Sequence, residues 1–146
     1  MKRLFLLLLT TATLFAKAQQ TQLIQKISIE WQLKQNDYPK SDQFSASFVL
    51  KNNAKSPISL QDWDLFFSYP REIVSVTSKN AISKAHGGEF RQISFVDGKA
   101  TLAAGQTLTI NYVAKGKSMN VTDAPSGLYW VAKRNPKINI AVGSFK

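Results

Sequence analysis

Residues 27–34 read Ile-Ser-Ile-Glu-Trp-Gln-Leu-Lys, and apolar and polar side chains alternate strictly along this stretch. Because successive side chains of a β-strand point to opposite faces, this period-2 pattern predicts a strand with one face buried and the other in water. The segment from Phe44 to Leu50 repeats the alternation. Between them, residues 35–42 are rich in Asn, Asp, Pro and Ser, which is typical of a turn. The fold is therefore predicted to begin as strand, turn, strand.

Strand-like segments continue along the rest of the chain. Further strand candidates are residues 63–69, 73–77, 90–96, 107–114, 128–133 and 138–142. Asp97-Gly98 and Ala104-Gly105 are turn signals between them, and Pro70 is expected to end or bend the strand before it. After residue 18, no segment shows the i, i+3, i+4 apolar spacing of an amphipathic helix. About eight short strands with turns between them predict an all-β fold, a single two-sheet antiparallel β-sandwich.

The first residues of the chain have the features of an export signal. Lys2 and Arg3 precede an apolar run that opens with residues 4–9, and Ala16-Lys17-Ala18 fits the small-x-small pattern of a cleavage site. The run is too short and too interrupted by threonine to span a bilayer. We therefore expect a signal peptide at 1–18 and one exported domain at 19–146, periplasmic or secreted and without a membrane anchor.

Length and cysteine content limit the possible functions. The expected mature chain of 146 − 18 = 128 residues has the size of one ordinary domain with a hydrophobic core. The sequence has no cysteine, although an oxidising compartment would allow disulfides. Thiol catalysis and thiolate metal sites are thus excluded, and stability must come from burial and from the hydrogen bonds of the sheets.

The chain is strongly basic, but its charge is dispersed. The formal charge of +10 falls to +7 when Lys2, Arg3 and Lys17 leave with the signal, because 10 − 3 = 7. Nucleic-acid binding needs Lys and Arg gathered on one face beside aromatic side chains, and in this chain they are scattered. The sequence therefore argues against nucleic acid and favours a loose attraction to an acidic cell surface or polysaccharide.

The residues that could carry catalysis are few. His86 is the only histidine, and no serine lies in a Gly-x-Ser-x-Gly elbow that could use it. Asp62, Asp64 and Glu89 are the acids from which a glycosidase-like carboxylate pair could be built, but neighbouring acids on a strand are typically solvated. No cluster has the spacing of a metal site, and no glycine loop could cradle phosphate. We expect no catalytic residue, no metal and no cofactor.

Aromatic side chains offer a better route to function, because sugar receptors use exposed rings beside amide and carboxylate groups. Trp31 alternates with isoleucine and leucine and is predicted to be core, and the core is also favoured for Trp63. Tyr129 and Trp130 are adjacent in one strand and must point to opposite faces, and the sequence leaves open which ring is exposed. The candidate carbohydrate-binding residues are Trp63, Tyr69, Tyr129 and Trp130.

Two motifs combine glycine, turn formers and the start of a strand. In His86-Gly87-Gly88-Glu89-Phe90 the glycines allow a tight reversal before a strand. In the stretch from Asn120 to Tyr129, Asp123 can close an Asx-type turn, Pro125 fixes a backbone angle and Gly127 allows a kink. An architectural role accounts for both motifs, and it is the favoured interpretation over a ligand-binding loop.

The order of these motifs resembles a known module. The matching residues are Asn52, Leu60-x-x-Trp63-x-Leu65-x-Phe67-Ser68, Arg71, His86-Gly87-Gly88-Glu89-Phe90, Ala104-Gly105 and Thr122-Asp123-Ala124-Pro125-Ser126-Gly127-Leu128-Tyr129. Over about 27–130 the chain resembles the non-catalytic, carbohydrate-binding-like N-terminal domain of chitobiase-type (glycoside hydrolase family 20) β-N-acetylhexosaminidases. It departs from that family at Gly88-Glu89, where Gly-Asp is common, and at Ala104-Gly105, where Pro-Gly is common.

The resemblance implies a β-sandwich similar to bacterial cellulose- and carbohydrate-binding modules. It also implies placement ahead of a TIM-barrel hexosaminidase domain that this chain lacks, so hydrolysis does not carry over. Two functions remain open at this point. One is a module that binds N-acetylhexosamine or chitin-type glycans, and the other is a structural or docking domain that packs on a separately encoded hexosaminidase barrel without binding sugar.

Overall fold

The computed structural model describes residues 22–36, 40–96, 100–118 and 120–146. Its strands are β1 Ile27–Asn36, β2 Gln43–Asn52, β3 Ile58–Ser59, β4 Trp63–Ser68, β5 Ile73–Val76, β6 Ala81–Ala85, β7 Phe90–Phe95, β8 Thr101–Leu102, β9 Thr107–Lys115, β10 Ser126–Ala132, β11 Asn135–Ala141 and β12 Ser144–Phe145. A short 3-10 helix, η1, spans Val121–Asp123. The predicted signal peptide at 1–18 lies outside the described residues. None of the helices in the described ranges is long and apolar enough to cross a membrane.

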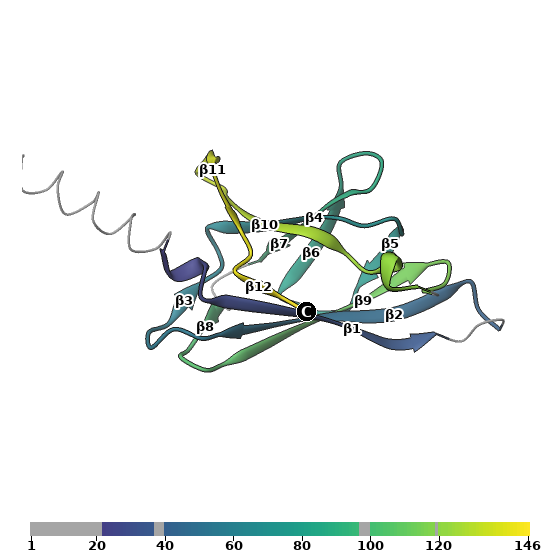
Figure 1. Ribbon diagram of the computed structural model, residues 1–146, viewed down its shortest axis with the longest axis horizontal. Coiled ribbons are helices and arrows are strands. Elements are labelled where there is room, and N and C mark those ends of the chain that lie inside the picture. Colours follow the sequence, from purple (N-terminus) through teal and green to yellow (C-terminus); the bar gives the residue numbers. More distant parts are fainter. Residues whose placement is uncertain (1–21, 37–39, 97–99, 119) are drawn as a thin grey trace, which may run out of the picture.

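Two five-stranded sheets stack face to face (Figure 1). The β1 sheet has the order β12-β1-β2-β9-β5, and the β4 sheet has the order β11-β10-β4-β7-β6. Strands β3 and β8 form a small separate ladder. Described neighbours pair antiparallel, except that β12 runs parallel to β1 along the edge of its sheet. The predicted all-β, two-sheet β-sandwich is confirmed.

Alternation along the strands places the core between the two sheets. On β4, Trp63, Leu65 and Phe67 are buried and alternate with half-buried neighbours. Strand β2 contributes Phe48, whose ring centroid lies 5.1 Å from that of Phe67 in an edge-to-face contact. Because edge-to-face pairs are a favoured arrangement of aromatic rings, this contact ties the two sheets together at their centre.

Trp31 on β1 is half-buried rather than fully enclosed, and it packs against the core from the side. Its indole Nε1 donates a hydrogen bond of 2.7 Å to the hydroxyl of Tyr112 on β9. Burial raises the pKa of Tyr112 to about 12 and also raises the pKa of Tyr69, so both hydroxyls are neutral at ordinary pH. A polar bridge therefore joins β1 to β9 across the intervening strand β2.

The two motifs of the sequence are held together by arginine side chains. The guanidinium of Arg71 donates a 2.6 Å bond to Oδ1 of Asp123, whose Oδ2 accepts the backbone N–H of Asn120 at 3.0 Å. Arg91 is buried and donates to the carbonyl of Gly88 at 2.6 Å and to the carbonyl of Arg71 at 3.3 Å. This geometry supports the architectural interpretation of both motifs.

The glycines of these motifs adopt the conformations that the sequence suggested. Gly87 and Gly88 have φ angles of 104° and 51°, and Gly127 has a φ of 59°. A side chain is strained at such angles, because Cβ clashes with the backbone. Gly87 and Gly88 reverse the chain into β7, and Gly127 is the second residue of β10. Both strands lie beside β4.

An aromatic patch as the candidate functional site

Three of the four predicted site residues lie in the core. Trp63 is 3% exposed, and Tyr69 and Trp130 are 0% exposed. Trp63 follows the inward parity of β4, while Trp130 shares its inward face with Leu128. A ring with no exposed face cannot stack on a sugar, so the geometry gives these three side chains a role in packing.

Tyr129 is the one predicted site residue that points outward. Its neighbour Trp130 pairs with Leu65 and faces the core, so Tyr129 must face the opposite side, where it pairs with Phe66 of β4. Tyr129 is half-buried, and burial raises the pKa of its hydroxyl. The hydroxyl is therefore neutral at ordinary pH and can both donate and accept a hydrogen bond.

Two further rings join Tyr129 on the outer face of the β4 sheet. Phe66 of β4 lies 5.7 Å from Tyr129 and 5.3 Å from Phe90 of β7, measured between ring centroids. Phe90 and Tyr129 are 6.2 Å apart, and the three rings are near parallel, with interplanar angles of 15° to 26°. Because the three separations are so similar, the centroids form a compact triangle rather than a row. We call these three residues the aromatic patch (Phe66, Phe90 and Tyr129).

His86 extends the patch on one side. Its ring centroid lies 5.5 Å from that of Phe66 and 5.9 Å from that of Phe90, in an edge-to-face contact with the latter. Nε2 of His86 lies 2.5 Å from Oε1 of Gln92 on β7. With the Gln92 amide in this orientation its oxygen accepts, and Nε2 of His86 is the donor of the bond. Gln92 in turn donates from Nε2 to the hydroxyl of Ser94 at 2.8 Å.

Polar groups border the aromatic patch along the strands. At one end, the hydroxyl of Ser68 donates to Oε2 of Glu89 at 3.2 Å. At the other, the carboxylate of Asp64 lies 3.6 Å from the ammonium of Lys133. Phe90 is 37% exposed, so its ring is open to a ligand from solvent. The outer face of the β4 sheet thus combines ring surfaces with amide, hydroxyl, imidazole and carboxylate groups.

The patch is suited to binding more than to metal chemistry. Within the described ranges of the chain, no three His, Cys, Asp or Glu side chains lie close enough to hold a metal ion together. Asp62 and Asp64, two of the acids from which a carboxylate pair could be built, contact Arg134 at 3.3 Å and Lys133 at 3.6 Å in separate ion pairs. Apolar rings with a polar border are instead the usual lining of ligand sites.

Sequence reasoning found only part of this patch. It put Phe90 in the glycine motif and Phe66 within the strand predicted at 63–69, but it named neither as a site residue. The signal that could have found Phe66 is parity, since Phe66 and Tyr129 each stand one position away from a buried aromatic residue of their own strand. What parity does not give is the pairing of β4 with both β7 and β10.

Known structures share this fold, although no protein-family profile and no curated protein sequence matches the chain. The structure is similar to an exo β-N-acetylglucosaminidase of glycoside hydrolase family 20 from Vibrio harveyi, solved with N-acetylglucosamine, at a TM-score of 0.64 and 15% identity. That similarity covers 83% of this chain and only 18% of the enzyme.

Two isolated domains are also similar. The chitin-binding domain of Chi18aC from Streptomyces coelicolor matches at a TM-score of 0.52 and 17% identity, over 75% of this chain and 93% of that domain. The CBM3b module of the scaffoldin ScaA from Acetivibrio cellulolyticus matches at 0.52 and 13%, over 85% and 99%. At these identities the comparisons show the fold alone, which is that of a carbohydrate-binding module.

Proposed function

We propose that this chain is an exported, non-catalytic module that binds N-acetylhexosamine or chitin-type glycans through the aromatic patch. The observation that carries the proposal is the compact triangle of Phe66, Phe90 and Tyr129 on an outer sheet face, beside the imidazole of His86. The fold of a carbohydrate-binding module supports it. The export signal predicted at 1–18 would deliver the module to the periplasm or the medium, where such glycans occur.

The patch matches the chemistry of a sugar ring. A pyranose presents C–H groups on its faces and hydroxyl or acetamido groups around its edge, so it stacks on an aromatic ring and bonds to polar groups at the border. The triangle is about the footprint of one sugar unit. Gln92 and Glu89 lie next to it and supply amide and carboxylate partners for the groups at the edge. A site of this size predicts weak binding, on the order of 4–8 kcal/mol.

The test uses chitin beads and soluble chitooligosaccharides with the full chain and two variants, Tyr129→Ala and Phe90→Ala. Loss of one stacked ring should weaken binding roughly tenfold, since ring stacking contributes about 0.5–1.5 kcal/mol beyond the area that it buries. The matched control is Ile82→Ala, because Ile82 is an apolar side chain on edge strand β6 of the same sheet and is 57% exposed. Unchanged binding of both ring variants, or an equal loss in the control, would refute the site.

A second candidate function rests on the enzyme comparison. The family 20 enzyme gives the higher TM-score, 0.64 against 0.52 for the isolated domains, and the match is a small part of that long chain. The chain would then be related to the N-terminal domain of chitobiase-type enzymes and would pack on a hexosaminidase barrel without binding sugar. Co-purification of a hexosaminidase from the native host, together with no retention on chitin or on a glycan array, would favour this docking function.

A further inference from the structure

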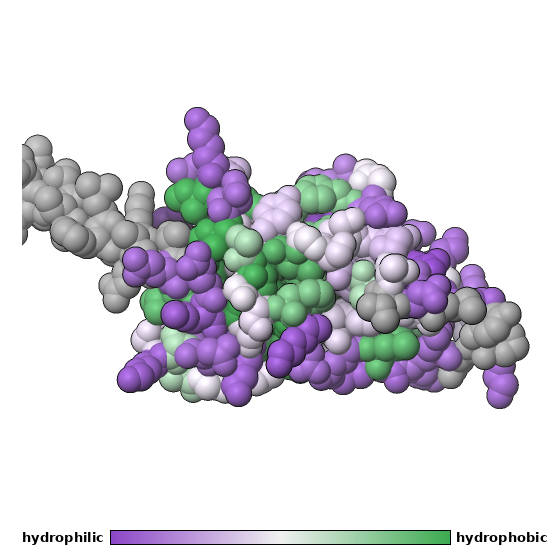
Figure 2. Space-filling model, in the orientation of Figure 1, coloured by the Kyte–Doolittle hydropathy of each residue, from purple (hydrophilic) through white to green (hydrophobic). Residues whose placement is uncertain are grey.

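The outer face of the β1 sheet differs in character from the face that carries the aromatic patch. Outward positions on the described strands β1, β2 and β9 are mainly Ser, Thr, Asn and Gln, and none is aromatic. Figure 2, in the orientation of Figure 1, shows predominantly hydrophilic side chains along the lower margin of the molecule, below β1 and β2. This face offers hydrogen bonds and charge rather than stacking surfaces.

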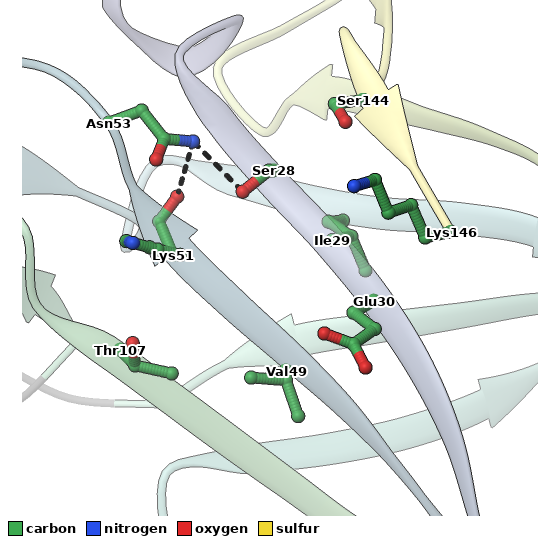
Figure 3. A pocket seen from close by; sticks show the side chains of 9 residues that line it. All are labelled: Ser28, Ile29, Glu30, Val49, Lys51, Asn53, Thr107, Ser144 and Lys146. Atoms are coloured by element: carbon green, nitrogen blue, oxygen red, sulfur yellow. Dashed lines mark hydrogen bonds between the residues drawn. The ribbon is translucent and has the colours of Figure 1, made fainter.

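A groove of about 440 Å³ indents this face where β12 lies against β1. Ser28 and Glu30 of β1 form its floor, Lys51 and Asn53 lie on the side of β2, and Ser144 and Lys146 lie on the side of β12. Figure 3 shows Lys51 and Lys146 on opposite sides of the β1 ribbon. The groove is therefore lined by hydroxyl, amide and apolar groups and by the carboxylate of Glu30, with a lysine at each side.

Several other polar groups of the groove take part in hydrogen bonds within the protein. Nδ2 of Asn53 donates to the hydroxyl of Ser28 at 2.8 Å, as drawn in Figure 3. The carboxylate of Glu30 accepts Nε2 of Gln32 at 2.8 Å, farther along β1. The main-chain oxygen of Lys146 accepts the backbone N–H of Trp31 at 2.8 Å and is thus turned into the sheet.

The two lysine side chains are available to a ligand. Among the described residues, neither Lys51 nor Lys146 takes part in an ion pair, whereas Arg71, Lys133 and Arg134 each do. Ammonium groups that are not paired attract anions, and the net positive charge of the chain strengthens that attraction at long range.

We propose that this groove binds a carboxylated or sulfated sugar unit of an acidic polysaccharide. The ammonium groups of Lys51 and Lys146 would hold the anionic group, while Ser28, Asn53 and Thr107 would bond to the hydroxyls of the sugar. A neutral sugar would find no ring on which to stack in this groove, so the site selects for charge. The groove lies on the opposite sheet from the aromatic patch, and the inference does not rest on the proposed function.

The experiment is affinity electrophoresis of the full chain in gels that contain polygalacturonate, dextran sulfate or neutral dextran. Retardation by the two acidic polymers, decreasing as salt is added, is the expected result. The double variant Lys51→Gln/Lys146→Gln should bind the acidic polymers roughly tenfold more weakly at low salt, since it removes both charges that hold the anionic group. Thermal melting of the variant checks that the fold is kept.

The matched control is Lys79→Gln/Lys137→Gln, which removes the same charge from two exposed positions outside the groove. Equal weakening by both double variants would show attraction to net charge alone and would overturn the site. So would retardation that neither double variant changes, or an equal affinity for neutral dextran. The assignment to polysaccharide would be overturned if a DNA duplex bound as tightly as the acidic polymers and if Lys51→Gln/Lys146→Gln abolished that binding.

Discussion

Replacing the buried amide of Asn52 is the sharpest test of how the sandwich is closed at the end of β2. Its Nδ2 donates to the carbonyls of Ser56 at 2.9 Å, Leu102 at 2.9 Å and Ala103 at 3.1 Å. Its Oδ1 accepts the backbone N–H of Ala54 at 2.8 Å. The side chain is 0% exposed, and its bond to the carbonyl of Leu102 is buried, while the other three bonds are partly buried.

The magnitude follows from the groups left without a partner. Asn52→Ala removes the partner of the buried Leu102 carbonyl and of three partly buried backbone groups, and each buried unsatisfied group costs about 1–3 kcal/mol. Water can reach the partly buried groups, so we expect a loss of about 2–4 kcal/mol in the free energy of unfolding. That is a large share of the roughly 5–15 kcal/mol that stabilises an ordinary domain.

Asn52→Asp should be worse at neutral pH and should improve in acid. The new carboxylate would be buried against carbonyl oxygens, which raises its pKa in the folded state above the unfolded value of about 3.9. The penalty is therefore absent below that unfolded value and grows as pH rises toward the folded pKa, because the folded state there binds the extra proton.

Urea unfolding at several pH values measures both effects as a shift in midpoint at constant slope. The control is Asn53→Ala, since Asn53 is the exposed neighbour whose Nδ2 bonds to Ser28 at 2.8 Å, and it should cost less than about 1 kcal/mol. If Asn52→Ala cost no more than this control, or if Asn52→Asp were no more stable in acid, the buried bonds of Asn52 would not be what closes this end of the sandwich.

Two further predictions concern the β1 sheet. Burial raises the folded pKa of Tyr112 to about 12, above its ordinary value of 10.0. The stability that this neutral hydroxyl contributes below pH 10 should therefore be lost as pH rises toward 12. In alkaline unfolding followed by tyrosinate absorbance, Tyr112→Phe should lose less stability than the unchanged chain. Gly143→Ala would place a Cβ 2.7 Å from the carbonyl oxygen of Gln25, so β12 should detach from β1. The Trp31 amide, which donates to the main-chain oxygen of Lys146, should then exchange its hydrogen faster. Unchanged protection of that amide would contradict the contact.

The long strands could be predicted because their alternation is unbroken. Residues 27–34 and 44–50 fall inside β1 and β2, and the inward set of β2 is the predicted one. The edge strand β6 was not predicted, since Ala81-Ile-Ser-Lys-Ala85 has no regular alternation of apolar and polar residues. As an edge strand it pairs with β7 alone. Strand β12 was missed for a related reason, because two residues carry no period at all.

The candidate site was predictable only in part, because a surface patch depends on register between distant strands. Adjacency alone required Tyr129 and Trp130 to take opposite faces, but their direction depends on the pairing of Trp130 with Leu65. Phe66 and Phe90 meet because β4 pairs with β7 in a register that sets Ser68 opposite Phe90. No local pattern in the sequence contains that register.

The two glycine motifs have a consequence for the aromatic patch that goes beyond turn formation. Arg91 holds the turn that delivers Phe90, through its bond to the carbonyl of Gly88, and it also bonds to the carbonyl of Arg71. Arg71 in turn holds Asp123, just before the strand that carries Tyr129. The two glycine motifs therefore supply two rings of the aromatic patch, Phe90 and Tyr129. Arg91 holds the turn before the first ring, and Arg71 holds the turn before the strand of the second. A change in this arginine network should for that reason alter stability and the geometry of the patch together.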